Sequence, residues 1–153
     1  MEKNNASEQT TYPSKKMPMW FRALFIFLLL FSLFFGYGFY LANFLSESQI
    51  AAMPEAMREL FLDIPKWVMF AGGTGVLSSI IGNVMVVFRK KQGAFILLIA
   101  PIMALLRDGW FMIDGRVMDL IPTFSLILSS LGFLAAFIQP ILAFYGIKNR
   151  WLK

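Results

Sequence analysis

The sequence predicts an all-α membrane protein, a four-helix transmembrane bundle with an amphipathic interfacial helix between spans 1 and 2. Apolar residues make up 58% of its 153 residues and aromatic residues 16%, which is more apolar surface than one small soluble core of this length can bury. A membrane-spanning helix needs about 20 mostly apolar residues to cross about 30 Å of hydrocarbon. Stretches of this kind predict spans at about residues 20–45, 67–88, 93–113 and 120–147.

The first span contains an uncharged stretch at residues 23–46. This stretch is too long for a signal-peptide core, and no small-residue cleavage site directly follows it, so we expect the helix to be retained. The residues before it, 1–18, are polar and lack an apolar period. Such a composition is typical of disorder, so residues 1–18 are expected to form a disordered cytoplasmic tail.

The loop between spans 1 and 2 has the pattern of an amphipathic helix or a pair of helices. Ser46 and Gln49 fit a capping box, Pro54 is expected to divide the segment, and Pro65 separates it from span 2. We expect this segment to lie on the membrane interface or to cover the bundle, with a dedicated ligand-binding lid as the alternative. The apolar residues at helical spacing are Ile50, Met53, Met57, Leu60 and Phe61.

Small residues repeat along span 2 at the spacing that lets membrane helices approach closely. The predicted helix-packing residues are Ala71, Gly75, Ser79 and Gly82. The glycine-rich run at residues 72–75 is not followed by Lys and then Ser or Thr, so we do not expect a phosphate-binding loop.

Spans 3 and 4 each contain a proline inside an apolar stretch. A proline removes one backbone hydrogen bond and frees the carbonyl four residues earlier. Pro101 would leave the backbone carbonyl of Leu97 without its helical donor, and Pro140 would do the same to the carbonyl of Ala136. Kinks are therefore expected in both spans.

Arg107 lies about 21 Å along span 3, short of its outer boundary. Its guanidinium either reaches lipid headgroups beside Trp110 or faces the bundle and binds an anionic group of a solute. Asp108 points about 100° away on a helix, so each charge is expected to need its own partner. The charged residues that follow, from Asp114 to Asp119, are expected to form a solvated turn.

Two amide side chains, Asn83 in span 2 and Gln139 in span 4, fall at similar depths in the membrane. They predict either one interhelical hydrogen bond, worth about 0.6–2 kcal/mol, or part of a transport site. The candidate intramembrane polar or substrate site therefore consists of Arg107, Asp108, Asn83 and Gln139.

Positive charge predicts the orientation of the bundle. Basic residues in short loops are retained in the cytoplasm, so both termini and the turn between spans 2 and 3 are expected on the cytoplasmic side of a bacterial inner membrane. Residues 149–153 would form a short cytoplasmic tail. Ten of the fourteen basic residues fall on that side: Lys3, Lys15, Lys16, Arg22, Arg89, Lys90, Lys91, Lys148, Arg150 and Lys153.

The chain contains neither cysteine nor histidine. Disulfides, thiolate catalysis, Ser-His-Asp chemistry and Cys- or His-based metal sites are therefore excluded within it. No paired carboxylate arrangement for acid–base work is visible either, so we expect no enzyme activity, metal or cofactor. Because the net charge of +5 is distributed as a topology signal, nucleic-acid binding is not expected.

Three features of the sequence form a recognisable set: the loop MPEAMRELF at 53–61 with IPKW at 64–67, the glycine-rich span 2 ending in RK at 89–90, and KNRWL at 148–152. Together they resemble a family of small bacterial four-helix inner-membrane proteins that often carry the label "sugar transporter". The resemblance covers roughly residues 20–152 and implies a four-helix fold and solute transport. This chain departs from the family at Arg107 and Asp108, where members tend to have uncharged or amide residues, so no binding residue is carried over.

Two functions follow as hypotheses. The first is a small-solute transporter-like protein whose polar interior is built from the candidate site. Four helices alone enclose little space, so this hypothesis expects a homo-oligomer in the bilayer. The second is a non-catalytic accessory or scaffolding subunit of a larger membrane complex, with the Gly75 face of span 2 as its contact surface.

Overall fold

The computed structural model describes residues 15–116, 120 and 123–153. In these residues the chain forms only helices and their connections. In order they are α1 (Met19–Asn43), α2 (Glu47–Ala51), α3 (Glu55–Asp63), α4 (Lys66–Val87), α5 (Gln92–Leu97), α6 (Ile99–Asp114) and α8 (Thr123–Lys148).

Within the described ranges, four helical segments are long and apolar enough to span a membrane: α1, α4, α5 together with α6, and α8. They begin and end within a few residues of the predicted spans, and the predicted fold class is confirmed. Many large apolar side chains point outward along these helices, among them Phe27, Phe70 and Ile102. Because lipid is the favourable surrounding for such a surface, the chain is a multi-pass membrane protein in contact with the bilayer.

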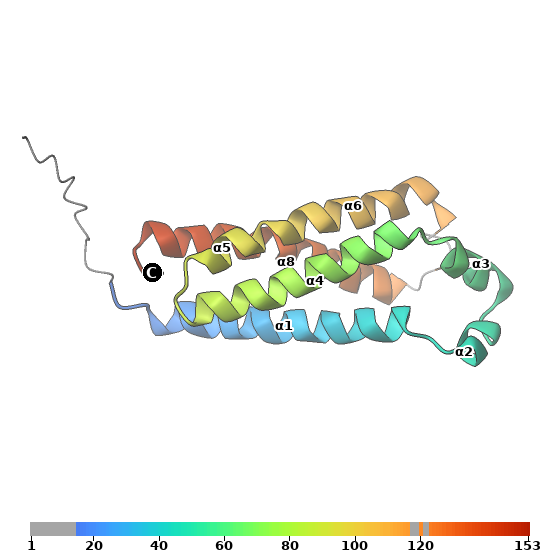
Figure 1. Ribbon diagram of the computed structural model, residues 1–153, viewed down its shortest axis with the longest axis horizontal. Coiled ribbons are helices and arrows are strands. Elements are labelled where there is room, and N and C mark those ends of the chain that lie inside the picture. The colour runs from blue at the N-terminus through green and yellow to red at the C-terminus, as the bar shows by residue number, and fades with distance from the viewer. Residues whose placement is uncertain (1–14, 117–119, 121–122) are drawn as a thin grey trace, which may run out of the picture.

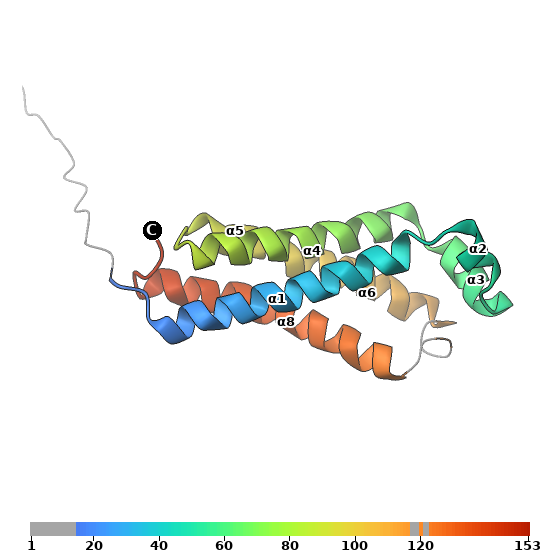
Figure 2. The same ribbon diagram turned by 90° about the horizontal axis from the view of Figure 1, so that it is seen from below.

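The four long segments run lengthwise beside one another (Figure 1). The short helices α2 and α3 lie at one end, here called the α3 end. The start of α1, the α4–α5 turn and the end of α8 lie at the other, here called the basic end. Helix α4 packs against both α1 and the α5–α6 pair. Helix α8 diverges from α1 and α6 toward the α3 end (Figure 2), so the bundle is most tightly closed at the basic end.

Two facing glycines bring α4 and α5 together near the basic end. A Cβ atom built on Gly93 would lie 2.7 Å from the carbonyl oxygen of Gly82 and 3.0 Å from the backbone nitrogen of Val86. A Cβ atom on Gly82 would lie 2.5 Å from Cγ of Leu97. Only glycine allows this approach, because no real Cβ atom sits so close to a backbone atom.

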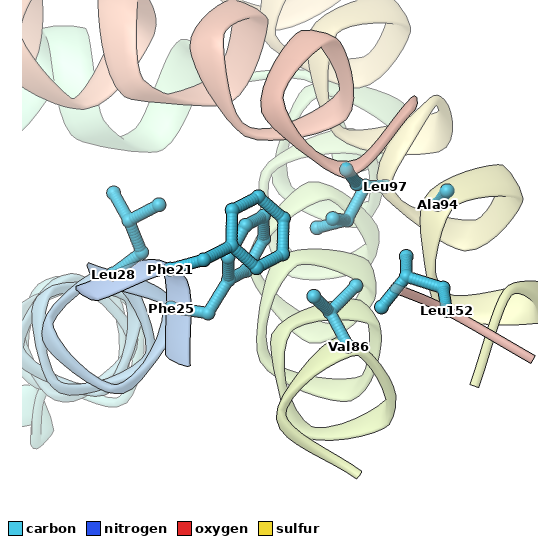
Figure 3. Packing of buried hydrophobic residues seen from close by; sticks show 8 residues of the cluster. Phe21, Phe25, Leu28, Val86, Ala94, Leu97 and Leu152 are labelled. Atoms are coloured by element: carbon cyan, nitrogen blue, oxygen red, sulfur yellow. The ribbon is translucent and has the colours of Figure 1, made fainter. Parts of the chain in front are cut away.

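A hydrophobic core closes the basic end of the bundle. Aromatic rings from α1 point toward α4 and α5, and Leu152 reaches the same cluster from beyond the end of α8 (Figure 3). The buried members are Phe21, Phe25, Leu28, Val86, Ala94, Leu97, Ala143 and Leu152.

Backbone hydrogen bonds tie both predicted tails to this end. The amide of Lys15 donates to the carbonyl of Arg150 at 3.0 Å, and the amide of Lys153 donates to the carbonyl of Arg89 at 2.7 Å. The Arg89 guanidinium donates to the carbonyls of Trp151 and Lys15. The segments at 15–18 and 149–153 are thus held against the bundle, while residues 1–14 of the predicted disordered tail lie outside the described residues.

The third span is interrupted where the sequence predicts a kink. Helix α5 ends at Leu97 and α6 begins at Ile99, and the amide of Leu98 donates to the carbonyl of Phe95 in a tighter turn. Pro101 has no N–H to donate to the Leu97 carbonyl, which explains the break at this point. Helix α8 runs through Pro140 without such an interruption.

The predicted amphipathic segment is a pair of short helices. Ser46 caps α2, because the amide of Gln49 donates to its hydroxyl and its own amide donates to the Gln49 side chain at 2.9 Å. Pro54 divides the pair and Pro65 precedes α4, as the sequence predicts. Leu60 of α3 is buried, so this helix packs on the α3 end of the bundle.

Candidate functional site

Arg107 lines two partly open cavities among the described residues. The outer cavity has a volume of about 880 Å³ and lies between α1, α4, α6 and α8, with Phe61 and Ile64 in its wall. The inner cavity measures about 70 Å³, and its lining includes Ser32 and Gln139. The two cavities are neighbours, because Phe35, Val76 and Phe133 also line both.

Small side chains make room for the inner cavity. Three of the four predicted helix-packing residues line it from α4, so at these positions small size leaves space as well as allowing close approach. Gly82 does not line this cavity but packs against Leu97. The small residues in the wall are Ala71, Gly72, Gly75, Ser79, Ala100, Ala104, Gly132, Ala135 and Ala136.

Arg107 and Asp108 form an ion pair in the cavity wall. Both Nε and Nη2 of Arg107 lie 2.6 Å from Oδ1 of Asp108. The expectation that each charge needs its own partner is therefore wrong. The two Cβ atoms do point apart on the helix, but the long arginine side chain turns back far enough to reach its neighbour.

The position of Arg107 depends on a glycine of α4. A Cβ atom on Gly72 would lie 3.3 Å from Cδ of Arg107, so the arginine stem lies against this gap in α4. Its side chain is 25% exposed and that of Asp108 is 16% exposed. Arg107 lines both cavities, whereas Asp108 lines only the outer one.

Asn83 and Gln139 do not bond to each other, as the predicted hydrogen bond would require. Instead both donate to a third residue, Ser32 of α1. Nδ2 of Asn83 lies 3.2 Å from the serine oxygen and Nε2 of Gln139 lies 3.4 Å from it. The polar contact therefore joins three spans, α1, α4 and α8.

The Ser32 hydroxyl determines which way both amides point. Its one proton is donated to the carbonyl of Leu28 at 2.8 Å, so its oxygen can only accept from the two amides. Oδ1 of Asn83 and Oε1 of Gln139 then have no hydrogen-bond partner within the described residues. Asn83 is 0% and Gln139 2% exposed, and an unpaired buried acceptor costs about 1–3 kcal/mol.

Gln139 and Ala136 line the inner cavity. Pro140 leaves the carbonyl of Ala136 without its usual helical donor. The deep end of the inner cavity is therefore bordered by an amide side chain and by a helix turn that lacks one backbone hydrogen bond.

Ion pairs at the α3 end join α3 to the end of α6. Arg116 donates to both carboxylate oxygens of Asp114, at 2.6 and 2.9 Å, and to Asp63 at 2.9 Å. Hydrogen bonds with Asp114 and then Asp63 raise the pKa of Arg116, so it stays charged. The described part of the predicted solvated turn thus connects α3 to α6 through Arg116. Asp119 lies outside the described residues.

Ser32 is the site residue that the sequence analysis missed. The one signal was a hydroxyl near the middle of the otherwise apolar first span.

Among the described residues no group of three or more Asp, Glu, His or Cys side chains is arranged to hold a metal ion. Comparison with protein-family models, curated proteins and solved structures gave no match for this chain.

Proposed function

We propose that the protein is a small-solute transporter-like protein in which one copy of the chain holds the solute path. The path begins in the outer cavity at the α3 end and continues past Arg107 to Gln139. The basic end faces the cytoplasm of a bacterial cell and the outer cavity opens on the opposite side of the inner membrane. The excess of Lys and Arg at the basic end supports this orientation.

The observation that carries the proposal is that Arg107 lines both cavities, with Gln139 in the wall of the inner one. A bundle that served packing alone would stabilise itself by filling this space with apolar side chains. Charged and amide side chains in the walls instead suit a polar solute.

The volume of the outer cavity bears on how many copies a solute site needs. Small-molecule sites in proteins occupy about 300–1,000 Å³, and the partly open outer cavity of a single copy measures about 880 Å³. One copy therefore offers space of the size that a solute needs, and the homo-oligomer stays a prediction.

One observation favours the second candidate function, an accessory subunit. The outer cavity lies where α8 diverges from α1 (Figure 2), and its lining is rich in phenylalanine. A helix of a partner membrane protein would fit such an apolar cleft. In that case the cavity would be dry in the assembled complex.

Access of water to the outer cavity separates the two candidates. The chain has no native cysteine, so a thiol reagent can modify only the one cysteine that is introduced. Ser129 lines the outer cavity, whereas Ile127, on the same helix, is 56% exposed on the outward face. We expect a membrane-impermeant, positively charged methanethiosulfonate, added to intact cells, to modify Ser129→Cys much faster than Ile127→Cys.

The rate difference is expected because a thiol reacts as its thiolate, which forms in water and not in lipid. Modification would be followed by the mass of the purified protein. Equal and slow modification of both variants would show that the cavity is closed to aqueous solutes. That result would reject the transporter-like proposal in favour of an accessory role.

A further inference from the structure

The charges in the outer cavity indicate a ligand class, and the inference rests on the proposed function. We infer that this cavity binds a zwitterion with an apolar body. Its anionic group lies on the guanidinium of Arg107 and its cationic group lies on the carboxylate of Asp108.

The pairing of the two charges disfavours ligands with a net charge. Arg107 and Asp108 neutralise each other in a partly buried wall. An anion on Arg107 would either displace Asp108 or add a net charge to a neutral pair away from bulk water, and a cation on Asp108 would do the same with the opposite sign. A zwitterion exchanges one partner for another at both groups, so neither charge is left alone.

The remaining hydrogen-bonding capacity of the pair fits this exchange. A guanidinium has five N–H donors, and its two contacts with Asp108 use Nε and Nη2 alone. Both contacts fall on the same carboxylate oxygen, Oδ1. Arginine donors and the second carboxylate oxygen are therefore left for a ligand in the cavity.

The walls of the cavity indicate the apolar body. Six phenylalanines contribute to the lining: Phe34, Phe35, Phe39, Phe61, Phe111 and Phe133. Such rings bury the apolar part of a ligand, and their faces also attract an ammonium group. The serines of α8 in the same wall are neutral and leave the charge balance to Arg107 and Asp108.

The inner cavity adds no charge to this balance. Its lining includes Arg107 and the neutral amide side chain of Gln139, with no carboxylate among the described residues. Arg107 and Asp108 therefore remain the two charged groups that a ligand of the outer cavity meets.

Two sources supply this chemistry, a free apolar amino acid and the headgroup of a zwitterionic phospholipid that enters between α1 and α8. The first arm of the test measures binding of radiolabelled L-phenylalanine to the purified protein. The competitors are 3-phenylpropanoate and 2-phenylethylamine, which keep the same ring but carry one charge. The second arm uses native mass spectrometry to compare retention of phosphatidylethanolamine and phosphatidylglycerol from nanodiscs containing both.

Wild-type protein is expected to prefer a zwitterion in one of the two arms. Asp108→Asn, which keeps the side-chain shape, is expected to weaken that binding by roughly tenfold or more, because the cationic group loses its partner. The same variant should bind the anionic probe, 3-phenylpropanoate in the first arm or phosphatidylglycerol in the second, better than wild type does. Arg116→Gln is the matched control, because it removes an arginine from an Asp-bound pair outside the cavity.

A second measurement does not depend on the folding of the Asp108 variant. L-phenylalanine or phosphatidylethanolamine should slow the modification of Ser129→Cys in a chain that keeps both charges, and the single-charge analogues should not. Equal binding of zwitterionic and singly charged probes, or no binding of either, would overturn the inference. If Ser129→Cys is still modified from water in that case, the proposed function stands and only the ligand class fails.

Discussion

The contact among Ser32, Asn83 and Gln139 is a set of three side chains on three different helices. The serine accepts from both amides and passes its own proton to its helix backbone. The arrangement fixes the rotation of α1, α4 and α8 about their axes. It also leaves two carbonyl oxygens without a hydrogen-bond partner within the described residues.

Removal of the shared acceptor should expose the cost of the arrangement. Ser32→Ala leaves two buried amide N–H groups without a partner and is expected to lower the free energy of unfolding by about 1–3 kcal/mol. Titration with a denaturing detergent measures the change. Ser130→Ala is the control, since Ser130 makes the same kind of bond to the carbonyl of Leu126 but is exposed. If Ser130→Ala lowers the free energy of unfolding as much as Ser32→Ala does, the shared-acceptor role is contradicted.

Residue identity alone predicted only part of this site. A buried amide in an apolar span is unusual enough to mark Asn83 and Gln139, whereas a serine is common in membrane helices and Ser32 gave a weak signal. The Arg107–Asp108 pair was missed because helix geometry fixes where Cβ atoms point but not where a long, flexible side chain ends. The contacts of Ser32 and the pairing of Arg107 with Asp108 both depend on helix rotation and on side-chain rotamers, which the sequence pattern does not specify.

At the scale of elements, the close approach of α4 and α5 is the tightest feature of the bundle. Gly93→Ala places a methyl group against the backbone of α4 at Gly82 and Val86. Because backbone atoms cannot move aside as a side-chain tip can, we expect a loss of about 1–3 kcal/mol in the free energy of unfolding.

Gly109→Ala supplies the matched control for this substitution. Nothing lies within 4 Å of a Cβ atom at Gly109, and alanine is a better helix former than glycine. Thermal unfolding should therefore show Gly109→Ala as neutral or slightly stabilising. Similar melting temperatures for the two variants would mean that α4 and α5 are farther apart than described.

The link between α3 and the end of α6 depends on one arginine. Arg116→Gln should release Asp63 of α3 from the end of α6, so hydrogen exchange within Glu55–Asp63 should become faster. The global stability should change by less than about 1 kcal/mol, because exposed ion pairs contribute little. Glu59→Gln, an exposed change on the same helix, should leave exchange unaltered; unchanged exchange in Arg116→Gln as well would show that the ion pairs do not hold α3.

Elements were the most predictable scale of this protein. Span lengths, the capping box at Ser46 and the break before Pro101 follow from local physics, namely hydrocarbon thickness, hydrogen-bond caps and a missing N–H. The cavities do not follow from such rules. They depend on how far α8 diverges from α1, which is decided by contacts between segments far apart in the chain.

At the scale of the whole molecule, the charge distribution predicts the orientation. With the α3 end outward, as proposed, Ser48→Cys in α2 should react with an impermeant thiol reagent on intact cells. Asn149→Cys, beyond α8 at the basic end, should react only after the membrane is permeabilised. The reverse labelling pattern would invert the topology and place the outer cavity on the cytoplasmic side.

The claim that the two cavities form one solute path is tested most directly at Ser79. Ser79 lines the inner cavity, whereas its neighbour Ser78 is also buried but bonds to the carbonyl of Gly75 and does not line it. Silver ions are small, water-borne and bind thiols. Applied to each side of the membrane in turn, they should block Ser79→Cys from later alkylation and leave Ser78→Cys reactive once the protein is denatured. Protection of Ser79→Cys from both sides is the result that a transporter-like path predicts, and equal behaviour of the two variants would show a dry interior and contradict it.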